Sequence, residues 1–327
     1  MNDRDLRVER AGSAPSRPAV VITGATEGIG RALAEEFARA GHTLLLVARD
    51  RESLERTASE LADTHGVEVS VTAQDLSTQV GCAGVEDALS RDNLYADTLI
   101  NNAGIMSSGF FQDEDPAKLA RLIDLDVRAV VDLTSRFLPG MIARRHGGVL
   151  NISSMVGFMP VPYQAAYAAS KAFVLSFTKA LAYETMGTKV RVSVLAPGSV
   201  ATRLHTKAGA QNSYYAHLFP MMTPEQVARA AYRGFRRGRS QIVPGIFNQL
   251  GASAMRFVPD FLVLPIMGLF FRVRDADGNA QGPGPGATAG GPGPGHKPVA
   301  ARQMSLGGAL LRSPVGARWW SRGGSNP

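Results

Sequence analysis

The sequence predicts a doubly wound α/β domain, a parallel sheet with helices on both faces, and three observations support this. Short, continuous apolar runs alternate with amphipathic helical segments from Pro18 onward, as in strands that are buried on both faces. A glycine-rich turn lies between the first apolar run and the first helical segment, where such domains bind phosphate. The length of 327 residues, with 45% hydrophobic residues, allows one large domain with a full core.

Seven strands are predicted in this chain. They span residues 19–23, 43–48, 67–73, 98–101, 149–153, 190–196 and 241–244. The first helix is expected over 28–40, and helical segments separate nearly all later strands. Right-handed crossovers then place a ligand site at the carboxyl ends of the strands.

The domain is expected to cover residues 18–275, with an apolar C-terminal segment over 246–272. Residues 1–17 are polar and predict a flexible arm. Residues 276–327 begin with glycine and proline repeats, which cannot bury enough surface to offset the entropy of ordering, so we predict a disordered tail.

Composition excludes several classes of protein. A single cysteine, Cys82, supports neither a disulfide framework nor a cysteine metal site, and no metal is predicted. The charged N-terminus lacks the apolar run of a signal peptide, and no stretch reaches the roughly 18 apolar residues of a membrane span, so a cytoplasmic protein is expected. The net charge of +7 is carried partly by the tail, so nucleic-acid binding is not predicted.

The glycine turn predicts a dinucleotide site. Gly24 permits the tight turn, Gly28 allows the backbone to approach a pyrophosphate, and Gly30 lets helix and strand pack closely. The free N–H groups at the start of the following helix favour phosphate, and Thr26 and Ile29 belong to the same loop. A chance glycine trio in a glycine-rich chain is the alternative, which the strand before and the helix after disfavour.

The end of the second strand is expected to select the cofactor. An acidic residue there would bind the ribose hydroxyl of NAD, but the chain has Ala48 followed by Arg49, which can pair with the 2′-phosphate of NADP. NADP(H) is therefore favoured over NAD(H), although Glu27 adds an opposing charge and Arg49 can also be a solvated surface residue. After the third strand, Asp75 and Leu76 are expected beside the adenine, with helix capping as an equally good use of Asp75.

Ser154, Tyr167 and Lys171 predict acid–base chemistry at a carbonyl oxygen. Tyr167 and Lys171 are four residues apart and share one face of a helix. A nearby ammonium stabilises a phenolate and lowers the pKa of a tyrosine, and a serine hydroxyl can hydrogen-bond the substrate oxygen. The Tyr-x3-Lys spacing alone is weak evidence, but the glycine turn upstream makes the set specific.

Over residues 18–270 the chain resembles the short-chain dehydrogenase/reductase family. The matching motifs are Thr-Gly-x3-Gly-Ile-Gly at 23–30, Asn101-Asn102-Ala103-Gly104, Ile152-Ser153-Ser154, Tyr167-x3-Lys171, and Pro197-Gly198 with Thr202. The resemblance implies a seven-stranded Rossmann sheet, a nicotinamide cofactor, and a homodimer or homotetramer.

The resemblance also assigns cofactor residues. It implies that Asn101 and its neighbours Asn102, Ala103 and Gly104 support the sheet and the adenosine side. It implies that Pro197, Gly198, Val200 and Thr202 border the nicotinamide, with Thr202 bonding the carboxamide. From its place in the catalytic set, Lys171 is also expected to reach the nicotinamide ribose, and Tyr167 is expected beside the cofactor as well. Ordinary turn chemistry is the alternative for Asn101 and Pro197.

One position departs from the family. Where its members usually carry an asparagine that helps a water bridge to the lysine, this chain has Asp126. An aspartate adds a charge near Lys171, so we expect Asp126 to be a fourth member of the site that slows catalysis without abolishing it. The alternative is that Asp126 faces elsewhere.

The substrate is expected to be hydrophobic. Apolar side chains flank the motifs: Met106, Met155, Phe158, Met159 and Tyr163. More occur in the loop 204–222: Tyr214, Tyr215, Phe219, Met221 and Met222. Core packing explains many of these equally well. The apolar run 257–271, which we expect Pro265 to interrupt, predicts a subunit contact or pocket wall before shallow membrane attachment.

These patterns predict an NADP-preferring oxidoreductase that interconverts a carbonyl and an alcohol. Tyr167 is the acid/base, Ser154 orients the oxygen, and Lys171 tunes the tyrosine and holds the ribose. A nucleotide-binding redox sensor or scaffold with little chemistry is the alternative from another class, and epimerisation is a third reading.

Overall fold

The computed structural model describes residues 16–202, 221–254 and 258–272. The chain divides into a compact unit over Met1–Pro283 and a second over Gly284–Pro327, which lies outside the described residues. The predicted tail, and nearly all of the predicted arm, also lie outside them, as do Tyr214, Tyr215 and Phe219. The arm prediction overlaps the fold by one residue, because Arg17 opens the first strand.

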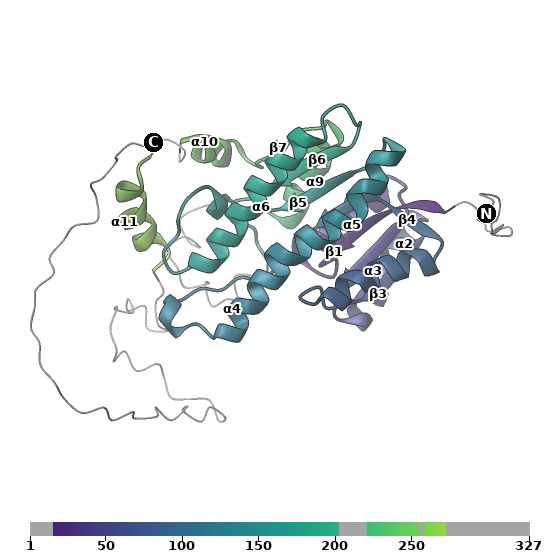
Figure 1. The fold of residues 1–327 in the computed structure, drawn as a ribbon, viewed down its shortest axis with the longest axis horizontal. Coiled ribbons are helices and arrows are strands. Elements are labelled where there is room, and N and C mark those ends of the chain that lie inside the picture. The colour runs from purple at the N-terminus through teal and green to yellow at the C-terminus, as the bar shows by residue number, and fades with distance from the viewer. Residues whose placement is uncertain (1–15, 203–220, 255–257, 273–327) are drawn as a thin grey trace, which may run out of the picture. The chain divides into compact units, whose positions relative to one another are not determined.

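A seven-stranded parallel sheet forms the centre of the first unit, in the order β3-β2-β1-β4-β5-β6-β7 (Figure 1). The strands are β1 (Arg17–Thr23), β2 (Leu44–Ala48), β3 (Val69–Ala73), β4 (Leu94–Asn101), β5 (Gly148–Ile152), β6 (Arg191–Leu195) and β7 (Gln241–Ile242). The predicted doubly wound fold is confirmed. The predicted strand limits differ by a few residues, most at β4, which starts four residues earlier than the apolar run indicates.

Helices occupy the connections between these strands, and the last two described helices follow β7. They are α1 (Gly28–Arg39), α2 (Arg51–His65), α3 (Gln79–Arg91), α4 (Pro116–Ile123), α5 (Ala129–Arg144), α6 (Ala165–Glu184), α9 (Pro224–Arg236), α10 (Ile246–Ala254) and α11 (Asp260–Phe270). Three shorter helical turns are η1 (Phe111–Asp113), the π-helical η2 (Asp124–Arg128) and η3 (Met155–Phe158).

Alternate residues of each strand face opposite sides of the sheet, which produces two apolar cores. In β1, Val20 and Ile22 pack in a cluster with α1, α2 and α9. Ala19 and Val21 pack in the other cluster, with α3 and α5. Residues of α5, α6 and β6 form a further cluster, and α5 and α6 cross one face of the sheet in Figure 1.

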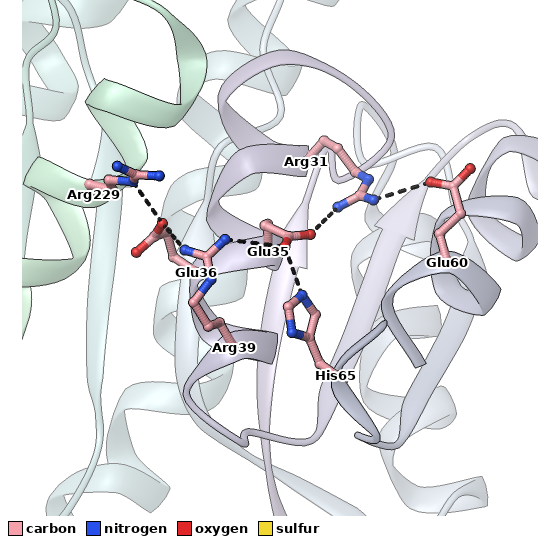
Figure 2. Close-up of polar contacts among 7 residues, drawn as sticks. All are labelled: Arg31, Glu35, Glu36, Arg39, Glu60, His65 and Arg229. Atoms are coloured by element: carbon pink, nitrogen blue, oxygen red, sulfur yellow. Dashed lines mark hydrogen bonds and ion pairs between the residues drawn. The ribbon is translucent and has the colours of Figure 1, made fainter. Parts of the chain in front are cut away.

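A charged network joins α1 to α2 and α9 (Figure 2). Glu35 of α1 bonds His65 of α2 at 2.7 Å, and Arg31 reaches Glu35 at 3.2 Å. Glu36 contacts Arg229 of α9 at 3.5 Å. The remaining contacts of the network are Arg31–Glu60, Arg39–Glu35 and Arg39–Glu36. The network therefore bridges three helices along the edge of one apolar core.

The apolar C-terminal segment forms two helices, α10 and α11. The expectation that Pro265 interrupts this segment was wrong, because it lies inside α11. Proline removes one N–H and disturbs the carbonyl four residues earlier, which here belongs to the exposed residue Phe261, where water can satisfy it. Among the described residues, no helix is both long and apolar enough to cross a membrane.

Candidate active site

A cavity of about 930 Å³ opens at the carboxyl ends of the central strands, between the glycine turn and α6. Every residue predicted to bind the cofactor lines it except Gly30, which lies behind the turn. Ser154 and Met106 line it as well. A cavity of this size suits a dinucleotide with a small substrate.

The glycine turn has the backbone conformation that the sequence predicts. Gly24 and Gly28 have φ angles of +65° and +57°, in the left-handed region that favours glycine. A Cβ at Gly30 would lie 2.2 Å from the carbonyl oxygen of Gly24, so only a hydrogen fits between helix and strand. No acidic residue stands in the first turn of α1, whose free N–H groups suit a phosphate.

Hydrogen bonds tie this turn to the end of β4. The backbone N–H groups of Asn102 and Ala103 both donate to the Thr23 hydroxyl at 2.9 Å. The Asn102 side chain donates to the carbonyl oxygens of Thr23 at 2.9 Å and Gly24 at 3.2 Å. The neighbouring Asn101 is buried and donates to Asn151 of β5 at 2.8 Å, as a support of the sheet.

The end of the cavity beside β2 and β3 carries a positively charged residue, Arg49, and a negatively charged one, Asp75. Arg49 is exposed, and no hydrogen bond or ion pair joins it to another residue that the structure describes. Asp75 accepts from Ser77 and pairs with Arg121 at 2.6 Å. Burial raises the pKa of Asp75, but Ser77 and the nearby cations outweigh it, and the net shift is downward. Asp75 thus shapes a turn, while Thr78 caps α3.

Arg56 of α2 lines this end too, although sequence reasoning missed it. It pairs with Glu52 at 3.8 Å and donates to Ser53 at 3.1 Å. Arg56 lies in a helix beyond the end of β2, and nothing in its sequence neighbourhood indicates a ligand contact. The packing of α2 beside β2 brings it to the cavity.

The other end of the cavity is closed by the loop after β6. Pro197, Gly198, Val200 and Thr202 all line it, and Val200 forms a parallel bridge with Met222. Ser199 also lines it, and its buried hydroxyl has no hydrogen-bond partner among the described residues. A buried hydroxyl without a partner is unfavourable, so it fits a ligand with polar groups such as a nicotinamide carboxamide.

α6 and the end of β5 bring the three predicted catalytic residues to the same cavity. Ser154 caps η3, and its Oγ accepts from the Val156 N–H at 3.4 Å. Tyr167 and Lys171 are buried on α6, and the Lys171 Nζ lies 5.5 Å from the centre of the Tyr167 ring. Lys171 also donates to the carbonyl oxygen of Ile152 at 3.4 Å.

Asp126 lies next to Lys171, as expected from the sequence, which predicted an additional charge near this lysine. Its Oδ2 is 2.8 Å from the Lys171 Nζ, and its Oδ1 accepts from the Ile105 N–H at 2.8 Å. Asp126 is buried and does not line the cavity. The alternative that it faces elsewhere was wrong.

The predicted substrate residues separate into three environments. Met106 lines the main cavity. Met155 packs instead in a core cluster with Val243, with Ala196 just after β6, and with Ala252 of α10. Tyr163, with φ +64°, lines a second cavity of about 260 Å³ against Phe110, whose ring is 5.1 Å away. Core packing therefore accounts for Met155, and neither Met155 nor Tyr163 lines the large cavity.

Phe271, just after α11, lines the main cavity and packs in one cluster with Tyr167 and Met106. The sequence indicated a pocket wall somewhere in the apolar C-terminal run but not this residue. Because Phe271 is more than a hundred positions from Tyr167, no local motif connects them.

A dinucleotide turn beside a Ser/Tyr/Lys set defines a class: oxidoreductases of the Rossmann fold that use a nicotinamide cofactor. The residues of the cavity fit such a cofactor. The glycine turn allows a phosphate to come close to the backbone, and the buried Ser199 hydroxyl has no hydrogen-bond partner among the described residues. Among the described residues, no group of three potential ligands could hold a metal ion.

Comparison with known proteins agrees with this class. A family model described as short chain dehydrogenase matches residues 18–213. A very-long-chain 3-oxoacyl-CoA reductase from Anas platyrhynchos is 35% identical over 220 residues, which are 64% of this chain and 66% of that protein.

Two solved structures show the cofactor choice within similar folds. A short-chain dehydrogenase from Sphingobium yanoikuyae in complex with NADPH is 33% identical, with a TM-score of 0.65, covering 74% of this chain and 96% of that one. One from Burkholderia phymatum in complex with NAD is 25% identical, with a TM-score of 0.65, covering 74% and 94%. The chain belongs to the short-chain dehydrogenase/reductase family of oxidoreductases.

Proposed function

We propose that this protein transfers hydride between NADP(H) and a carbonyl/alcohol pair, with Tyr167 as the acid/base. The observation that carries the proposal is the convergence of Ser154, Tyr167 and Lys171 on one cavity with the glycine turn. When bound, the nicotinamide supplies or accepts the hydride. Each of the three side chains then has a distinct task.

The Ser154 hydroxyl donates a hydrogen bond to the substrate oxygen and fixes its position. In reduction, the Tyr167 hydroxyl gives its proton to the oxygen as negative charge develops there, and in oxidation the phenolate takes the proton back. The Lys171 ammonium holds the cofactor ribose and stabilises the phenolate.

Arg49 supports NADP(H) as the cofactor. It is an exposed cation beside the cavity that interacts electrostatically with Asp75, and no hydrogen bond or ion pair joins it to a described residue, so a ribose 2′-phosphate could pair with it directly. A solved relative holds NADPH and another holds NAD, so the family admits both.

The apolar side chains of Met106 and Phe271 beside Tyr167 support a hydrophobic substrate. The Anas platyrhynchos relative is by its name a reductase of 3-oxoacyl-CoA, which agrees with carbonyl reduction.

Calorimetric titration with NADPH and NADH tests the cofactor assignment. We expect Arg49→Ala to weaken NADPH binding about 10-fold, which is about 1.4 kcal/mol, and to leave NADH binding unchanged. Arg51→Ala is the matched control, because Arg51 pairs with Glu55 at 3.2 Å and does not line the cavity. Equal weakening by both variants would refute the role of Arg49.

A panel of hydrophobic ketones and aldehydes, followed at the NADPH absorbance, tests the chemistry, with Tyr167→Phe as the inactive control. Binding of neither nucleotide by folded protein would overturn the dehydrogenase proposal. Tight binding without any Tyr167-dependent turnover would favour the redox sensor or scaffold.

We also propose a cytoplasmic homodimer or homotetramer. Large apolar side chains are exposed on α10 and α11, among them Phe247, Leu250, Phe261 and Leu269, and such surfaces favour a subunit contact. Sedimentation analysis that finds only monomers would contradict the assembly, and pelleting with anionic vesicles would favour membrane attachment instead.

A further inference from the structure

The pair of Asp126 and Lys171 is a buried ion pair whose carboxylate has no contact with the cavity. Asp126 is 1% exposed and Lys171 is 6% exposed. The Oδ2–Nζ distance is 2.8 Å, and the second carboxylate oxygen is held by the Ile105 N–H. The Ile105 N–H therefore holds one oxygen of Asp126, and the other oxygen faces the Lys171 ammonium as an ion pair, without a hydrogen bond from any described residue.

The local backbone structure positions the Asp126 carboxylate beside Lys171. Asp126 stands in the π-helical turn η2 between α4 and α5, and π turns occur frequently at functional sites. Gly104 leaves room for the pair, because a Cβ there would lie 3.1 Å from Asp126 Oδ2 and 3.3 Å from Lys171 Nζ.

The Lys171 ammonium donates a hydrogen bond to the Ile152 carbonyl oxygen and faces the Asp126 carboxylate as an ion pair. Lys171 also lines the cavity. The ion pair fixes the ammonium beside the ring of Tyr167 but carries no net charge.

We propose that Asp126 is a positioning residue that acts through Lys171: by neutralising the ammonium it keeps Tyr167 protonated to higher pH. The inference deepens the proposed function and rests on it, because it assigns Tyr167 the proton-donating form at neutral pH. That form is the one that carbonyl reduction requires, so reduction is favoured over alcohol oxidation near neutral pH.

The sign follows from the charges around the phenol. An isolated ammonium would attract the phenolate and lower the pKa of a tyrosine, and an adjacent carboxylate cancels much of that attraction. Burial lowers the pKa of Lys171, but Asp126 and then Tyr167 outweigh it, and the net shift is upward. Burial raises the pKa of Asp126 against the opposing effect of Lys171.

Other charges near α6 are paired with each other or distant. On the elements packed against α6 these groups are Asp124 with Arg128, Lys118 with Glu114, Arg121 with Asp75, and the exposed Arg191 at the opposite end of β6. The segment of α11 and Phe271, which packs against Tyr167, carries the exposed Asp260 at its start and Arg272 at its end. α6 itself carries Lys179 and Glu184, more than one turn beyond Lys171. Asp126 is the carboxylate in contact with Lys171.

A substrate-free measurement tests the inference. Tyrosinate absorbance is followed against pH in the full-length protein, and the curve of Tyr167→Phe in the same background is subtracted to isolate Tyr167. We expect Asp126→Asn to lower the pKa of Tyr167 by about one unit. Asp124→Asn is the matched control, since Asp124 lies in the same turn but pairs with Arg128, and it should leave the curve unchanged.

Turnover gives the second readout. The oxidation rate should rise with pH and the reduction rate should fall with pH. In Asp126→Asn, the midpoint of each profile should shift to lower pH by about one unit, as the Tyr167 titration does. An unchanged Tyr167 titration in folded Asp126→Asn overturns the inference but leaves the hydride-transfer proposal intact. Failure to find a substrate or to bind a cofactor would count against the hydride-transfer proposal. It would not affect the Tyr167 titration, which uses neither. Asp126→Ser carries the same expectation if the asparagine variant does not fold.

Discussion

Replacing Gly30 by alanine tests the closest contact of the dinucleotide turn. The added Cβ would lie 2.2 Å from the Gly24 carbonyl oxygen and 2.4 Å from the Asn102 Nδ2. Neither atom can move freely, because the first is backbone of the turn and the second is held by hydrogen bonds to Thr23 and Gly24. Helix α1 and the end of β1 must therefore separate.

The expected magnitude combines two opposing effects. Overpacking costs about 1–3 kcal/mol, whereas alanine in place of glycine stabilises a helix by up to about 1 kcal/mol. We therefore expect Gly30→Ala to lower the free energy of unfolding by about 1–2 kcal/mol. Because the turn shifts away from its phosphate-binding geometry, nicotinamide dinucleotide affinity should fall at least about 10-fold.

Urea unfolding and calorimetric titration measure these two effects separately. Gly251→Ala is the matched control, because it gains the same helix propensity in α10 and its nearest neighbour, the Met155 Cε, is 3.8 Å away. If Gly30→Ala matched the wild type in both stability and affinity, the assignment of the turn as a close-packed phosphate site would be refuted.

Two further predictions concern ionisable groups. Burial raises the pKa of Glu35, but its hydrogen bonds and charge interactions with His65 and Arg31 outweigh burial, and the pKa is lowered overall. This carboxylate therefore stabilises the fold at neutral pH and stabilises it less as pH falls through its folded pKa. Glu35→Gln should lower the free energy of unfolding by about 1 kcal/mol at neutral pH and lose that difference in acid, unlike the exposed control Glu52→Gln. Burial raises the pKa of Cys82 to about 11, so a thiol reagent should label it near neutral pH only after urea unfolding; rapid labelling of native protein would contradict this.

The sequence predicted those features that short segments determine. The order of strands and helices, the tight turn at Gly24, and the shared helical face of Tyr167 and Lys171 follow from local patterns, and the structure agrees. Patterns of this kind specify which residues lie close along one element or at one turn.

Features that depend on distant segments were not predicted. Phe271 reaches the cavity only because α11 folds back over residues near Tyr167. Met155 adjoins the catalytic motif in sequence, but its side chain turns into the core toward α10. Pro265 is tolerated within α11 because the helix surface near it is exposed, which residue type alone does not reveal.

Lys171 shows how the catalytic geometry depends on the absence of side chains. At the backbone of Lys171, a Cβ on Gly157 would lie 2.8 Å from the carbonyl group, so only glycine lets η3 approach α6 this closely. At the other end, Gly104 leaves space for the ammonium and for Asp126. Backbone and head group of Lys171 are thus both located by glycines outside the phosphate turn. A larger residue at either position would move the lysine relative to Tyr167, and hence change the electrostatics of the proposed proton donor without altering any of the residues proposed to exchange protons or contact the substrate.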